Sequence, residues 1–249
     1  MRVSPTDPTL YLLDPTDLDD LPPHLERYGR HARAAVEWAS TYLCGPHAAL
    51  GREGPVCPYT QPSLERGLFW LTIYPGAHPE LIDVSAAATR YGSWFLELRP
   101  RAGKDAHYKA ILMLFPDLAA ARAPDLIDTV QAALKPAFTA RGLMIGQFHA
   151  TCDEPGIWNR NFRPLRSPLP LLAIRHMVRT DAPFLTKDAR YLAAYLRWFG
   201  HDVPDRLQAP VREAALAFGL AAPDRSNGSG ARVAPYEIDR SRPLAPRTQ

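Results

Sequence analysis

Apolar residues recur along the chain with the two spacings that distinguish helices from strands. Apolar positions three and four residues apart predict helices over 25–43, 79–98, 187–199 and 204–218. Short apolar runs bounded by proline or glycine predict strands over 68–74, 108–115, 143–149 and 171–178. Residues 116–140 form a further predicted helical region, which prolines interrupt at 124 and 136. The chain therefore predicts four strands separated and flanked by helices.

The order of these elements indicates an α+β fold with a single mixed, partly antiparallel sheet flanked by helices. Gly146 lies inside the third strand and prolines bound the fourth, which favours this sheet over a purely parallel one. Residues 1–24 carry five prolines, so we expect an extended lead-in before a single domain over 25–221. Residues 222–249 begin with a glycine- and serine-rich linker and predict a flexible C-terminal tail.

Composition narrows the class of protein. Of the 249 residues, 46% are hydrophobic and 10% aromatic, enough for a sizeable core and against a disordered or fibrous chain. The apolar runs are too short to span a membrane, and the N-terminus lacks the pattern of a secretory signal. Three widely spaced cysteines favour a reducing, cytoplasmic environment. A net charge of +3 does not indicate a nucleic-acid partner, and a homodimer is left open.

The first candidate for chemistry is the end of the third strand. His149 closes that strand, with Gln147 on the same face and Gly146 on the other. A glycine opposite a histidine leaves space for a flat group to approach the backbone. The alternative is an ordinary histidine whose hydrogen bonds are satisfied. A metal site of His149, Cys152 and Asp153 is disfavoured because the paired ligand spacing of structural zinc is missing. Cys152 could also be a nucleophile paired with a histidine, but no local signature of such a cysteine surrounds it, which favours a bystander.

Two further candidates are a cysteine and a run of arginines. Cys57 precedes Pro58 in a loop, where a thiolate ligand for iron competes with a small residue fixed in a turn. Five arginines and no acidic residue or lysine lie between positions 160 and 179. Guanidinium groups suit carboxylates and phosphates, so these arginines predict an anionic small-molecule ligand. The alternative is a solvated surface whose arginines pair with Asp153, Glu154 or Asp181.

Three short motifs carry a resemblance to known proteins: Cys57-Pro58-Tyr59, Gly146-Gln147-Phe148-His149 and Ile174-Arg175-His176-Met177. With these motifs in this order, the sequence resembles an uncharacterised actinobacterial family of natural-product gene clusters. It is also remotely similar to the YqcI/YcgG haem proteins, over about residues 50–185. Characterised members of the latter group are haem-dependent oxygenases that hydroxylate nitrogen in amino acids.

This resemblance implies a haem-dependent N-oxygenase of an amino acid or small amine. His149 would be the axial ligand of the iron, with Cys57 as the substitute, while His176 and Gln147 would take part in catalysis. The haem propionates or a substrate carboxylate would pair with Arg163, Arg166 and Arg175. Trp158 and Phe162 would line the apolar pocket.

Two alternatives compete with the haem enzyme. The first is a cofactor-free accessory protein of a biosynthetic pathway that binds an anionic small molecule through the arginine-rich loop. The second is an interaction protein that reaches a partner through its tail, residues 227–249.

Overall fold

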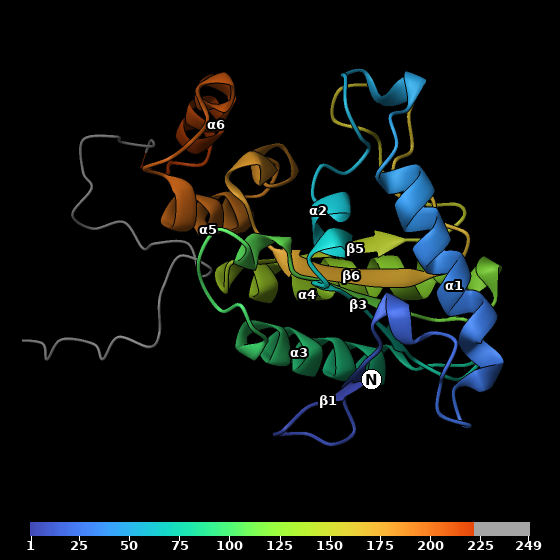
Figure 1. Cartoon of the computed structure of the whole chain (residues 1–249). Coiled ribbons are helices and arrows are strands. Elements are labelled where there is room, and N and C mark those ends of the chain that lie inside the picture. The colour runs from blue at the N-terminus through green and yellow to red at the C-terminus, as the bar shows by residue number, and fades with distance from the viewer. Residues whose placement is uncertain (222–249) are drawn as a thin grey trace, which may run out of the picture.

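A computed structural model describes residues 1–221 of the chain (Figure 1). The expected tail over 222–249 lies outside the described residues. The six strands are β1 (Arg2–Val3), β2 (Tyr11–Leu12), β3 (Phe69–Ile73), β4 (Ala110–Leu114), β5 (Leu143–Phe148) and β6 (Leu171–His176). The six α-helices are α1 (Gly29–Trp38), α2 (Thr60–Glu65), α3 (Leu81–Glu97), α4 (Thr129–Ala140), α5 (Ala189–Phe199) and α6 (Asp205–Ala217). No helix in this part of the chain is long and apolar enough to cross a membrane.

Four strands form the central sheet, in the order β3-β4-β6-β5. β3 and β4 are parallel, and β6 is antiparallel to both of its neighbours. It follows that β3, β4 and β5 run in one direction, so their carboxyl ends meet at one edge of the sheet. The predicted α+β class with a mixed, partly antiparallel sheet is confirmed.

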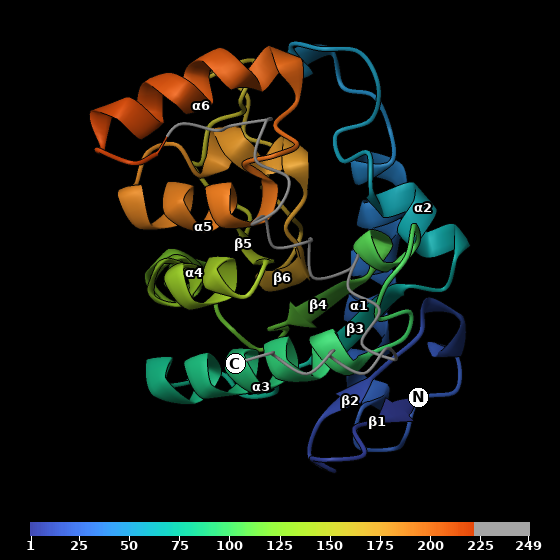
Figure 2. The ribbon, with the colours of Figure 1, turned by 90° about the vertical axis from the view of Figure 1, so that its left-hand side faces the viewer.

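Helices cover both faces of the sheet (Figure 2). One core lies between the sheet and the helices α3 and α4, and it includes Trp70, Phe95 and Phe138. A second core packs α1 and the N-terminal segment against the opposite face. A third core joins α5 and α6 to Met144 on β5 and to Met177 just after β6. These helices arise where the sequence places apolar side chains on one helical face.

The N-terminal segment, expected to be an extended lead-in, packs against the central sheet. β1 and β2 pair antiparallel, and Leu12 and Leu13 are fully buried. The backbone groups of Leu13 and Leu71 exchange hydrogen bonds of 2.8 and 2.9 Å, which attach this segment to β3. Leu10 and Leu12 pack into the core that contains α3, whereas Leu13 packs into the core on the opposite face of the sheet.

The predicted helices and strands occur within a few residues of the expected positions. The short helix α2 was not predicted, because its six residues are too few for a periodic pattern to emerge. The region 116–140 divides into a short 3₁₀ turn, a π-helical segment (Pro124–Asp128) and α4. This division places Asp128 directly before α4, beside the end of β5.

Candidate metal centre

The carboxyl end of β5 leads into a tight turn that gathers polar side chains. β5 ends at Phe148, and the carbonyl of the next residue, His149, accepts the backbone N–H of Cys152 at 3.1 Å. The backbone N–H of Ser167 donates to the same carbonyl at 3.3 Å. The turn folds Cys152 back toward His149, and the packing of α4 on β5 brings Asp128 to the same place.

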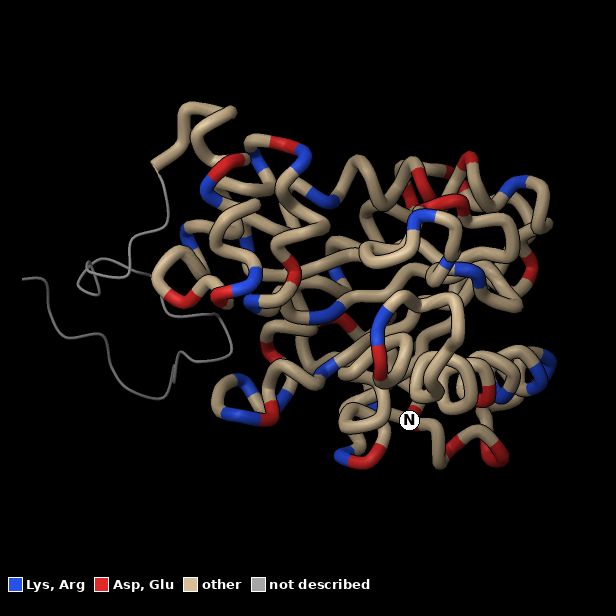
Figure 3. The backbone as a smooth tube through the Cα atoms, turned by 90° about the horizontal axis from the view of Figure 1, so that it is seen from above, with Lys and Arg blue, Asp and Glu red and all other residues tan. Residues whose placement is uncertain are grey.

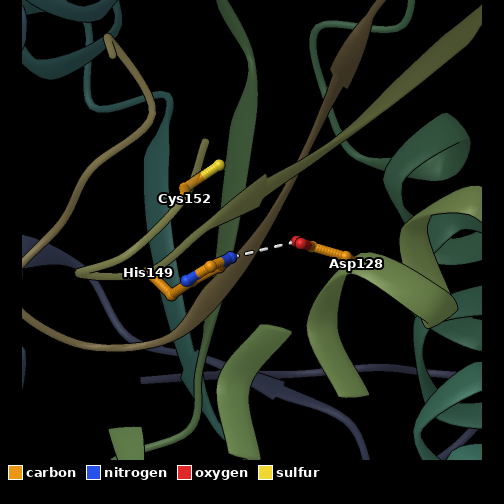
Figure 4. Close-up of side chains that lie close together, drawn as sticks. All are labelled: Asp128, His149 and Cys152. Atoms are coloured by element: carbon orange, nitrogen blue, oxygen red, sulfur yellow. Dashed lines mark hydrogen bonds and ion pairs between the residues drawn. The ribbon is translucent and has the colours of Figure 1, made fainter. Parts of the chain in front are cut away.

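Asp128, His149 and Cys152 form a compact cluster of three potential ligands (Figure 4). His149 Nε2 lies 3.1 Å from Asp128 Oδ1, and His149 Nδ1 lies 3.1 Å from the hydroxyl of Thr151. One ligand atom from each of the three residues lies within 4.8 Å of the other two. The cluster therefore presents an oxygen, a nitrogen and a sulfur donor around one point.

The burial of the three side chains differs in a way that leaves one side open. His149 and Cys152 are each 1% exposed, whereas the side chain of Asp128 is 44% exposed. The nitrogen and sulfur donors are therefore buried, whereas the carboxylate is accessible to solvent. Burial raises the pKa of the Cys152 thiol, so the sulfur is protonated near neutral pH.

The geometry is close to what a bound ion requires. A tetrahedral ion with bonds of about 2.0 Å to nitrogen and oxygen holds those two atoms about 3.3 Å apart. His149 Nε2 and Asp128 Oδ1, which share a hydrogen bond, lie 3.1 Å apart, close to this value, and the Cys152 thiol lies within 4.8 Å of a ligand atom of each residue. Ligating histidines also use the second ring nitrogen to bond a neighbouring polar group, a role that Thr151 fills here.

The carboxylate considered from the sequence, that of Asp153, is not the one in the cluster. Asp153 has an 82% exposed side chain and binds Arg163 at 2.6 Å instead. Cys152, expected to be a bystander, lies with its thiol in the cluster. Asp128 was missed because it stands 21 residues before His149, and short-range ligand spacing cannot reveal such a partner.

The predicted arginines separate into two groups. Arg163 binds Asp153, and Arg166 Nε donates to the carbonyl of Cys152 at 3.4 Å, so both lie beside the turn of the cluster. Arg175 is remote from it on β6, and its guanidinium pairs with Asp181 through hydrogen bonds of 2.7 and 2.8 Å. Arg175 therefore agrees with the alternative given above, in which an arginine of this run pairs with Asp181.

His149 and His176, expected as the axial ligand and a catalytic residue of one haem, lie far apart. His176 is the register partner of Leu143, and His149 follows six residues after Leu143 on β5. At about 3.3 Å per residue the two histidines are about 20 Å apart, too far to flank one iron. His176 is buried next to Phe95, with ring centroids 4.9 Å apart, and burial lowers its pKa well below the usual value.

The other residues expected around haem are dispersed or already engaged. The Phe148 ring lies next to Gly146, so the space expected there for a flat group is filled. Cys57 packs in the core beneath α1, on the other face of the sheet. The described residues therefore do not fit a haem as arranged.

The remaining predicted residues lie near the strand end without joining one pocket. Gln147 is half-buried on β5, on the same face as His149. Phe162 is buried and stacks on His47 at 4.5 Å, while Trp158 is 49% exposed and lies against Gly51. Neither aromatic side chain contributes to the cluster.

Comparison with known proteins identifies a family without assigning a function. A family model described as "Domain of unknown function (DUF6875)" matches residues 32–210, which include Asp128, His149 and Cys152. No curated protein and no solved structure matches the chain. Because the matched segment spans more than half of the sequence, the chain belongs to the DUF6875 family.

Proposed function

We propose that this protein binds one divalent transition-metal ion through Asp128, His149 and Cys152 and uses it on a small anionic molecule. The observation that carries the proposal is the convergence of three different donor atoms within 4.8 Å, with the second nitrogen of His149 held by Thr151. An acidic surface cluster without a metal would not combine a buried thiol and a buried imidazole in this way.

The donor set indicates which ions fit. A thiolate and an imidazole favour Zn²⁺, Co²⁺ or Fe²⁺ over Mg²⁺ and Ca²⁺, which prefer all-oxygen sites. Three protein ligands leave a tetrahedral ion with one position for water or substrate, the arrangement typical of catalytic rather than structural zinc. The partly exposed Asp128 lies on the side from which a ligand would enter.

The neighbouring arginine supports an anionic ligand. Arg166 is exposed and uses its Nε on the Cys152 carbonyl, while a guanidinium has five N–H donors in all. Its remaining donors are available to a carboxylate or phosphate next to the ion. The bound ion would supply Lewis acidity and a water of lowered pKa, and Arg166 would hold and orient the anion.

Elemental analysis after equilibrium dialysis against Zn²⁺ tests the proposal. We expect about one zinc per wild-type chain, and loss of this zinc in His149→Ala and Cys152→Ser. Cys57→Ser is the matched control, since it removes a cysteine outside the cluster and should keep the metal. Equal zinc content in the wild type, Cys152→Ser and Cys57→Ser would refute the assignment.

Haem binding stays a prediction of the family resemblance, and the same preparation distinguishes it. Protein produced with haem supplied should lack a stoichiometric Soret band if the metal proposal holds. A stoichiometric Soret band that is lost in His149→Ala would replace the proposed ion with haem iron.

A further inference from the structure

A second potential site lies at the same edge of the sheet, at the end of β3. A cleft of about 430 Å³ opens there between β2, α3 and the segment that precedes α1. Figure 2 shows that α3 and β2 lie on the same side of the sheet, next to β3. Three strand spacings, about 14 Å, separate β3 from β5 and its cluster, so the cleft is distinct from the proposed metal centre.

Four tyrosines give the cleft flat, apolar walls. Tyr11 comes from β2, Tyr28 from the turn before α1, Tyr74 from the end of β3 and Tyr91 from α3. Internal hydrogen bonds hold three of them: the Tyr91 hydroxyl lies 2.6 Å from Thr72 Oγ1, Tyr11 donates to the Ile73 carbonyl at 2.9 Å, and the Tyr28 hydroxyl donates to Asp117 Oδ2 at 2.5 Å. Tyr28 and Tyr91 are 2% and 5% exposed, whereas Tyr11 and Tyr74 are partly exposed, so the latter two can stack on an aromatic ligand.

The charged side chains in the lining are arginines, and two carboxylates outside the lining pair with them. The fifteen lining residues include Arg27 and Arg90 and no carboxylate. Burial raises the pKa of Tyr11 to about 12, so its phenol stays neutral and adds no negative charge. The Arg27 and Arg90 side chains are 69% and 50% exposed and each has one carboxylate partner outside the lining, Asp117 and Asp7 respectively.

The N–H groups of these arginines that are not yet used can donate hydrogen bonds to a second anion. Arg90 uses one terminal nitrogen for Asp7 and Thr9, and Arg27 uses one for Asp117 and the Tyr28 hydroxyl. A guanidinium offers further N–H groups in a planar fork that matches a carboxylate. We propose that this cleft binds a small aromatic carboxylate, with its ring among the tyrosines and its carboxylate between Arg27 and Arg90.

The size of the cleft agrees with this ligand class. A volume of about 430 Å³ falls in the range of small-molecule sites and holds one or two fused rings with a short substituent. The lining residues from Thr9 to Tyr28 precede the segment that the family model matches. The proposal is independent of the metal centre, since no residue of the cluster lines the cleft.

Calorimetric titration with 2-naphthoate tests this site, with the uncharged ketone 2-acetylnaphthalene as the ligand control. We expect saturable binding of the carboxylate and an affinity loss of about tenfold or more in Arg90→Gln, because a charge-assisted contact is removed. Arg33→Gln is the matched protein control, as this arginine on α1 pairs with Asp19 and does not line the cleft.

Three results would overturn the proposal. They are the absence of saturable naphthoate binding to folded wild-type protein, equal affinity for the uncharged ketone, and an unchanged affinity in Arg90→Gln. Asp128→Asn separates the two sites. Naphthoate binding that survives Asp128→Asn supports the cleft, whereas its loss would place the ligand at the metal centre.

Discussion

The ion pair between Arg175 and Asp181 allows a quantitative prediction about what holds β6 in place. Asp181 is 2% exposed. Its oxygens accept hydrogen bonds from both terminal nitrogens of Arg175, and one of them also accepts the backbone N–H of Val178 at 2.9 Å. The change Asp181→Asn keeps the shape of the side chain and removes its charge. The guanidinium, whose side chain is 28% exposed, then lacks its counter-ion.

The expected cost follows from this geometry. Breaking a buried pair by removing one partner costs about 3–5 kcal/mol, and the partial exposure of Arg175 reduces this. We therefore expect Asp181→Asn to lower the free energy of unfolding by about 2–3 kcal/mol in urea denaturation followed by tryptophan fluorescence.

The pair Arg179–Asp202 provides the matched control. Its closest approach is 3.3 Å and both side chains are more than half exposed, so Asp202→Asn should cost less than about 1 kcal/mol. Equal costs for Asp181→Asn and Asp202→Asn would refute the structural reading of Arg175 and return it to the candidates for anion binding. Zinc binding by folded Asp181→Asn protein should equal that of the wild type.

Three other changes test the metal centre and the core. Thr151→Val should weaken zinc binding by about tenfold or more in a chelator competition, because the second nitrogen of His149 loses its partner; unchanged affinity would remove Thr151 from this role. Because burial raises the pKa of Cys152, its thiol must lose one proton to the metal. Zinc affinity should thus rise about tenfold more per pH unit from pH 6 to 8 in the wild type than in Cys152→Ser, and parallel profiles would exclude the thiol as a ligand. Gly92→Ala should lower the free energy of unfolding by about 1–3 kcal/mol, because the added Cβ would lie 2.9 Å from the buried Phe138 ring; a stability equal to that of the wild type would contradict the packing between α3 and α4.

The sequence was sufficient for the longer elements, though not for β1, β2 and α2, because the longer ones are marked by local chemistry. Gly142 precedes β5, Pro170 precedes β6, and apolar runs fill both strands, so their limits follow from neighbouring residues. The order of strands depends on which apolar faces pack together over long separations. The pairing of β4 with β6 therefore could not be read from the chain.

The candidate site could be predicted only in part. His149 was identified because it ends a strand, and strand ends often carry functional side chains. Its partner Asp128 belongs to a π-helical segment that proline-rich sequence makes irregular, so no periodic pattern places it near β5. The positive and negative residues are interspersed over the described backbone (Figure 3), so charge patterning did not mark the site either.

A titration with Co²⁺ followed by absorption spectroscopy tests the central claim most directly. Cobalt replaces zinc in mixed N, O and S sites, and a bound thiolate adds a sulfur-to-metal charge-transfer band that marks coordination by cysteine. We predict that this band saturates at one cobalt per chain, disappears in Cys152→Ser and persists in Cys57→Ser. A wild-type titration without the band, or one whose band survives in Cys152→Ser, would contradict a metal centre built from Asp128, His149 and Cys152.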